Sequence, residues 1–121
     1  AEHRDSSATR LINREMALAR MGGDAGLLKD VAKLFAEHAP QWLSAAGDAH
    51  RAQDVKTLKR LSHTLKNGAD NLGATSIVEL AHAVEQHAAQ HQLVAAGAAL
   101  ESLQAAIAGL LVEVDELTVT T

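Results

Sequence analysis

Apolar residues recur at spacings of three and four along most of the chain, which is the period of an amphipathic α-helix. The clearest run lies near the C-terminus and comprises Leu100, Leu103, Ile107, Leu110, Val114 and Leu117. A second run, over residues 54–73, comprises Val55, Leu58, Leu61, Leu65, Ala69 and Leu72. Such runs are typical of helices that bury one face against neighbouring helices.

Two further stretches show the same period. The first follows Asp24 and comprises Leu27, Val31, Leu34, Phe35, His38, Trp42 and Ala46. It predicts core packing for Trp42 and a buried, hydrogen-bonded core position for His38. Pro40 interrupts this stretch, and predicts a kink in one helix rather than two separate helices. The second stretch comprises Ile77, Leu80, Val84 and Ala88.

Polar residues and glycines mark where these helices begin and end. Asn13, Asp24 and Asp54 are predicted N-caps. Thr75 or Ser76 is predicted to cap the fourth helix of the chain, and Ser76 with Glu79 forms a candidate capping box. Glycines at 22, 23 and 73 are suited to helix C-termini.

Together these signals predict an all-α fold, an up-down-up-down four-helix bundle with a short extra helix at its N-terminal side. We expect residues 1–8 to be a polar tail or linker and residues 9–121 to form one domain. The stripes on four helices can satisfy one another, so we expect a monomer.

Composition excludes several classes of site. The chain has no Cys, so it has no disulfide, thiolate nucleophile or Cys-ligated metal. Its net charge of −4, without a run of Lys or Arg, indicates no nucleic-acid partner. Phe35 and Trp42 are the only aromatic residues, which argues against stacking of bases or sugars. We see no stretch approaching a membrane span and no apolar leader at the start, and therefore expect a cytoplasmic domain without membrane contact.

One polar helix face carries candidate chemistry. His63, Lys66, Asn67 and Asp70 stand at i, i+3, i+4 and i+7, so they share the face opposite the leucines. Lys56, Lys59 and Arg60 extend it with positive charge. A neutral imidazole offers a nucleophilic nitrogen, and a nearby ammonium could neutralise a phosphoryl group placed on it. Spacing alone, however, does not distinguish such a carrier from an ordinary solvated face.

A more specific signal is the run LSHTLKNGADNLGA over residues 61–74. It resembles the signature of histidine phosphotransfer (HPt) domains of bacterial two-component phosphorelays. In that signature a His is followed by an apolar residue at +2, Lys at +3, a small-residue segment and Gly at +10. The segments Met21–Asp24, Leu27–Leu28 and Leu34–Phe35 also look like the opening of the family's second helix.

The resemblance implies a role for individual residues. His63 would be the phosphorylated residue and Lys66 the cation beside the phosphoryl group. Glu85 would accept a hydrogen bond from Nδ1 of His63, leaving Nε2 as the attacking atom. Gly68 and Ala69 would keep the helix surface low beside the His. The residues implied in partner docking are Lys59, Asn67, Gly68 and Asp70.

The resemblance also implies a function. The domain would accept a phosphoryl group on His63 from an aspartyl-phosphate receiver domain and pass it to another receiver. Its partners would be response-regulator receiver domains and a hybrid sensor histidine kinase. It would hold no cofactor, since Mg²⁺ would belong to the receiver. It would be a carrier without autonomous kinase activity, and its polar start favours a domain excised from a longer hybrid kinase over a free protein.

One departure and three alternatives stay open at this point. Asn67 stands where the family usually has Gly, and it would either hinder docking or donate its amide to the phosphoryl oxygens. The main alternative is a helical interaction module without phosphotransfer activity. A metal site at His87 and His91, at i and i+4, lacks an evident third ligand. A dimeric histidine kinase is disfavoured by Thr64, where an acidic residue is usual, and by the lack of an ATP-binding segment.

Overall fold

The computed structural model describes residues 11–119, and this part of the chain is helical with no strand. Its helices are α2 (Arg14–Arg20), α3 (Ala25–Arg51), α4 (Val55–Asn71), α5 (Thr75–Ala89) and α6 (Leu93–Val119). The all-α prediction is confirmed, and α3 runs through Pro40 as one helix. The predicted tail at residues 1–8 lies outside the described residues.

Three predicted N-caps are confirmed. The side-chain oxygen of Asn13 accepts from the backbone N–H of Met16 at 3.0 Å, at the start of α2. Asp24 accepts from Leu27 N–H at 3.0 Å before α3, and Asp54 accepts from Thr57 N–H at 3.2 Å before α4. Each bond satisfies a backbone donor that the first helical turn leaves without a partner.

The predicted cap of α5 is wrong. Its N-cap is Ala74, without a side-chain cap bond, and Thr75 is already the first helical residue. The reason lies in the turn from α4, where Gly73 adopts φ 65° and the N–H of Ala74 donates to the carbonyl of Ala69 at 3.0 Å. A Cβ on Gly73 would also lie 2.7 Å from the carbonyl oxygen of Asn13. This tight turn ends with Ala74 at the N-cap position, so Thr75 and Ser76 both lie inside the first turn of α5.

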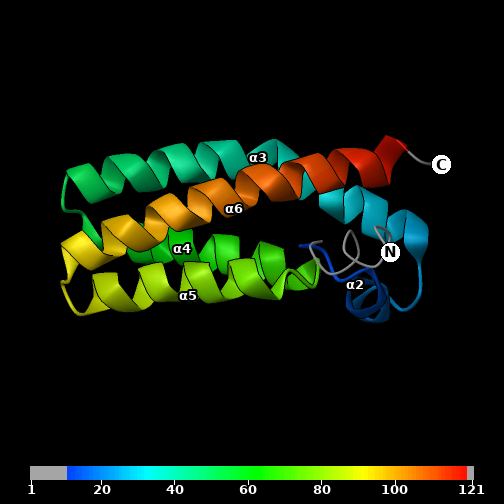
Figure 1. Cartoon of the computed structure of the whole chain (residues 1–121), viewed down its shortest axis with the longest axis horizontal. Helices are drawn as coiled ribbons and strands as arrows, with labels where there is room; N and C mark the ends of the chain where they lie inside the picture. Colours follow the sequence, from blue (N-terminus) through cyan, green and yellow to red (C-terminus); the bar gives the residue numbers. More distant parts are fainter. Residues whose placement is uncertain (1–10, 120–121) are drawn as a thin grey trace, which may run out of the picture.

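The four long helices pack in a closed order, with α3 on α4, α4 on α5, α5 on α6 and α6 back on α3. Successive long helices run in opposite directions, and the short α2 lies at the end of the molecule where α4 meets α5 (Figure 1). The carboxylate of Glu113 on α6 holds the segment before α2, because it accepts from the N–H groups of Leu11 and Ile12 at 2.7 and 2.9 Å.

The core contains the predicted leucine stripes of α4 and α6, but the buried face of α3 differs from the prediction. Buried residues of α3 are Leu28, Ala32, Phe35, Ala39, Ala46 and Ala49. Leu27 and Leu34 are 44% and 56% exposed. Alanines on the inward side let α3 approach α4 and α6 closely, which leaves the larger side chains on its flank. His38 is exposed, so its predicted core position is wrong, while Trp42 is partly buried against the core.

Helix α6 corrects the expectation that no stretch of the chain approaches a membrane span. The segment Leu93–Thr118 is long and apolar enough to span a membrane by length and composition, with a mean hydropathy of 1.5. Abundant alanine raises that value, while the larger side chains Leu103, Ile107 and Leu110 are fully buried. A core helix passes the same test, so this property alone does not place α6 in a membrane.

Leu65→Ala should destabilise the fold, because Leu65 is fully buried in the middle of α4. Loss of a buried leucine side chain costs about 2–5 kcal/mol through lost transfer energy and the cavity left behind. Chemical denaturation measures the change. A loss below about 0.5 kcal/mol, which is typical of surface positions, would show that this face of α4 is not in the core.

Gly68→Ala should also destabilise the fold, although alanine favours helix by about 1 kcal/mol over glycine. A Cβ at this position would lie 2.5 and 2.6 Å from Cδ1 and Cε1 of Phe35 on α3. Such overpacking costs about 1–3 kcal/mol, which outweighs the gain in helix propensity. Asn67→Ala, at the exposed neighbouring position, is the matched control and should not lower stability. A Gly68→Ala variant more stable than the wild type would contradict the close approach of α3 and α4.

Candidate functional site

His63 stands on α4 with its side chain 55% exposed. The residues around it in sequence fix the helix, since Ser62 and Leu65 are fully buried. The Ser62 hydroxyl donates to the carbonyl of Leu58 at 2.8 Å, so this buried polar group is satisfied within its own helix. A helix held in this way presents the imidazole outward at a defined place.

Glu85, on α5, connects the two polar residues of α4. Its Oε2 lies 3.4 Å from Nδ1 of His63, and its Oε1 accepts a hydrogen bond from Nζ of Lys66 at 2.9 Å. The side chains of Lys66 and Glu85 are only 22% and 19% exposed. The structure therefore brings together the three residues that the sequence marked, with the ion pair partly buried between α4 and α5 and the imidazole more exposed.

Competing effects determine the pKa of the Glu85 carboxyl, and with it the charge of the site. Burial acts to raise the pKa of its carboxyl, but the hydrogen bond and charge of Lys66, together with His63, outweigh it and leave the pKa below its usual range. Glu85 is therefore ionised at neutral pH. It forms an ion pair with Lys66 through one oxygen and presents the second oxygen to the imidazole.

The residues predicted to contact a partner do not all lie on one open surface. Lys59 and Asn67 are exposed. Asp70 is joined to α2, because Nη2 of Arg20 donates to its Oδ1 at 3.2 Å. Gly68 faces the Phe35 ring of α3, which leaves no room there for a side chain.

The two small residues Gly68 and Ala69 differ in their surroundings. Ala69 is fully buried in the core and does not line the surface beside His63. Gly68 is needed where α3 and α4 come closest. The interpretation that Ala69 keeps the outer surface low is therefore wrong, whereas Gly68 is half-buried and lines a surface groove, so its predicted role beside His63 stays a prediction.

Sequence reasoning missed an apolar groove between α3 and α4. It has a volume of about 280 Å³ and is lined by Val31, Leu34, Phe35, His38, Trp42, Gly68 and Asn71. The rings of His38 and Trp42 are stacked, with centroids 5.5 Å apart and planes 23° apart. Nδ1 of His38 also bonds the carbonyl of Leu34 at 2.8 Å. The available signal is the large-residue stripe of α3, which the sequence pattern alone assigns to the core.

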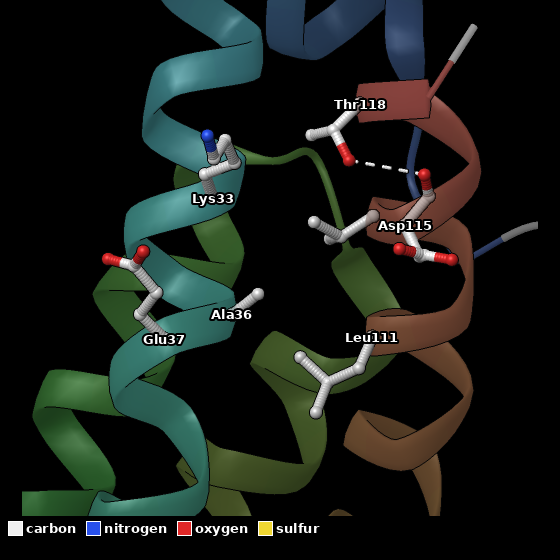
Figure 2. Close-up of a pocket in the computed structure, with 7 residues that line it drawn as sticks. Lys33, Ala36, Glu37, Leu111, Asp115 and Thr118 are labelled. Atoms are coloured by element: carbon white, nitrogen blue, oxygen red, sulfur yellow. Dashed lines mark hydrogen bonds between the residues drawn. The ribbon is translucent and has the colours of Figure 1, made fainter.

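A second hollow, of about 270 Å³, lies between α3 and α6 (Figure 2). Ala36 and Leu111 point into the gap, and the hydroxyl of Thr118 donates to the carbonyl of Asp115 at 3.1 Å. Its remaining lining residues are Lys33, Glu37 and Val114. It contains no His, so it offers no second candidate for the phosphorylated residue.

The metal alternative receives no support. Within residues 11–119 no group of three or more His, Asp or Glu side chains could hold a metal ion. His91 follows the end of α5 and has φ 58°, so the helical i, i+4 relation to His87 does not hold. Nδ1 of His87 instead lies 3.0 Å from Oε1 of Gln92.

A comparison with protein families agrees with this geometry. The model of the family described as Hpt domain matches residues 30–113, well over half of the chain. The match contains the whole of α4 and α5, and with them His63, Lys66 and Glu85. No curated protein and no solved structure matches the chain. Hpt domains are phosphocarriers that take part in histidine phosphotransfer in two-component phosphorelays rather than enzymes in the usual sense. The chain belongs to the Hpt domain family.

Proposed function

We propose that His63 accepts a phosphoryl group from the aspartyl phosphate of a receiver domain and passes it to another receiver domain. The observation that supports this most directly is the exposed His63 imidazole with the Lys66–Glu85 pair behind it. With Glu85 at Nδ1, the nitrogen that remains for attack is Nε2. Lys66 lies one turn along the helix and supplies a positive charge for the phosphoryl oxygens.

Phosphoryl transfer depends mainly on positioning and charge stabilisation. The domain would supply the nucleophile and a rigid surface. The receiver would supply the aspartate and Mg²⁺, so we propose no cofactor in this domain and no kinase activity of its own. The phosphoryl donor upstream would be a hybrid sensor histidine kinase acting through its receiver, in the cytoplasm and without nucleic acid.

We also propose that the four long helices form an up-down-up-down bundle with α2 as the short extra helix, and that the domain acts as a monomer. The closed order of packing among α3, α4, α5 and α6 supports the bundle. The buried stripes of these helices face one another, which leaves no long apolar seam that requires a second copy.

A receiver that reaches His63 must cover the surface around it. On the α5 side this surface is charged, through Lys66 and Glu85, whereas on the α3 side it is the apolar groove that contains Leu34 and Trp42. Gly68 and Asn71 of the His-bearing helix line the same groove. We therefore include the groove with Lys59 and Asn67 in the proposed docking face, and Asn67 would act there by limiting or favouring particular receivers.

The alternative is an interaction module that has the same fold without phosphotransfer. It would keep the helical packing and the groove but would not depend on His63. Phosphorylation, rather than binding, therefore separates the two functions.

His63→Gln should abolish phosphoryl acceptance while the fold survives, because Gln keeps polarity and helix propensity but is no nucleophile. The test incubates each protein with a phosphorylated receiver domain and detects label that is acid-labile and base-stable. His82→Gln is the matched control, because His82 is another exposed histidine that does not line the groove, and this variant should still accept label on His63. A His63→Gln variant with unchanged circular dichroism that accepts label at the wild-type rate would place the site elsewhere.

Leu34→Ser should weaken receiver docking, because it removes an exposed apolar side chain from the groove beside His63. Leu34 is 56% exposed, so the fold should lose little. Val112→Ser is the matched control, since Val112 is 60% exposed on α6 and does not line this groove. We expect the apparent affinity for the receiver to fall several-fold in the first variant alone, as measured by the receiver concentration that gives half-maximal transfer rate. Equal effects of the two substitutions would remove the groove from the docking face.

A further inference from the structure

We propose that Glu85 keeps a proton on Nδ1 of His63 before and after phosphorylation, so that the phosphoryl group is carried on a positively charged imidazole ring. This inference rests on the proposed function. It adds that Glu85 affects how readily the phosphoryl group leaves His63. Glu85 would thus be a positioning residue that also sets the leaving ability of the ring.

The geometry places an anion at the nitrogen that does not react. Oε2 of Glu85 is 3.4 Å from Nδ1, the His63 side chain is 55% exposed, and Nε2 is the ring nitrogen that this contact does not involve. The carboxylate has little freedom to move away, because its other oxygen is bonded to Lys66 at 2.9 Å and its side chain is 19% exposed. A phosphoryl group on Nε2 would leave this contact in place.

Among the charged groups named here near the His63 ring, Glu85 is the one that stabilises a positive charge on it. Lys66, Lys59 and Arg60 stand at +3, −4 and −3 from His63 on α4, and all of them disfavour a positive ring. On the α3 side, His38 is bonded to a backbone carbonyl of its own helix. The anion in contact with the ring is Glu85 of α5, and its lowered pKa keeps it charged at neutral pH.

The atoms and electrons balance without any proton transfer. In acceptance, the lone pair of Nε2 attacks phosphorus, the bond from phosphorus to the aspartyl oxygen breaks, and its electron pair leaves on the carboxylate. Nδ1 keeps its proton, so the product is a phosphorylated imidazolium. In donation, the P–N bond breaks, its electron pair returns to Nε2, and the ring leaves as neutral imidazole.

Without the proton on Nδ1, the same donation would have to expel an imidazolate anion, which is a far poorer leaving group. Glu85 therefore favours a phosphohistidine that is ready to transfer in either direction. It does so through its charge, since a neutral acceptor at this place could orient the ring but would stabilise a cation much less.

The test compares the wild type with Glu85→Gln, which keeps a hydrogen-bond acceptor of the same size and removes the charge. Each protein is phosphorylated with phosphoramidate, a small-molecule donor that needs no receiver. The ¹⁵N shifts of the phosphorylated His63 ring are then followed against pH, and transfer to an unphosphorylated receiver is timed across the same range. Lys66→Met is the matched control, because it removes the ion pair but leaves the carboxylate.

We expect the pH midpoint for loss of the Nδ1 proton to fall by about one unit or more in Glu85→Gln, an effect typical of losing one close charge. Transfer to the receiver above that midpoint should slow by roughly tenfold, the factor that corresponds to one pH unit. Lys66→Met should leave the midpoint unchanged or raise it. Circular dichroism checks that each variant is folded.

Equal midpoints in the wild type and Glu85→Gln would overturn the inference, as would a midpoint that falls equally in Lys66→Met. These outcomes are distinct from failure of the proposed function. If a phosphorylated wild-type domain transfers nothing to any receiver, the relay role fails while the ring titration still reports what Glu85 does.

Discussion

The site depends above all on the burial of one face of α4. Leu58, Leu65 and Leu72 have no exposed surface and are spaced seven residues apart, so they hold the helix along two full repeats. A helix fixed along one face must turn its opposite face to solvent. His63 is therefore held at the surface by the packing of the opposite face, and it cannot rotate inward without opening the core.

Burial of one helix face also positions the site residue of α5. Val84 is fully buried, and its neighbour Glu85 consequently lies at the edge of the core, where it contacts Lys66 of α4. The ion pair with Lys66 then joins two helices whose relative rotation is already determined by apolar packing. This order of causes explains how a carboxylate can sit in a partly buried place and remain charged: the packing positions it, and the ammonium of Lys66 compensates for its loss of water.

The sequence predicted much of this molecule, and the failures have physical reasons. The stripes of α4 and α6 are predicted correctly because their buried positions carry large aliphatic side chains. In α3 the buried positions are largely alanine, such as Ala32 and Ala39, which give a weak hydrophobic signal, while the large residues lie on the flank. The nearness of Glu85 to His63 came from resemblance, since spacing within one helix cannot fix the register between two. The apolar groove between α3 and α4 was missed because the large residues of α3 that line it were assigned to the core.

Adjacent positions on α4 are under different structural constraints, as Asn67 and Gly68 show. Position 68 lies against the ring of Phe35, so any larger side chain must displace that ring of α3. Position 67 is exposed and supports nothing in the core. Natural selection can therefore change the residue a partner meets at 67 without repacking the protein, whereas a change at 68 requires compensation in α3. When such a domain is duplicated, changes at exposed positions such as 67 could give each copy its own receiver and prevent transfer to the other copy's receiver. Positions packed against a neighbouring helix, such as 68, would stay nearly constant.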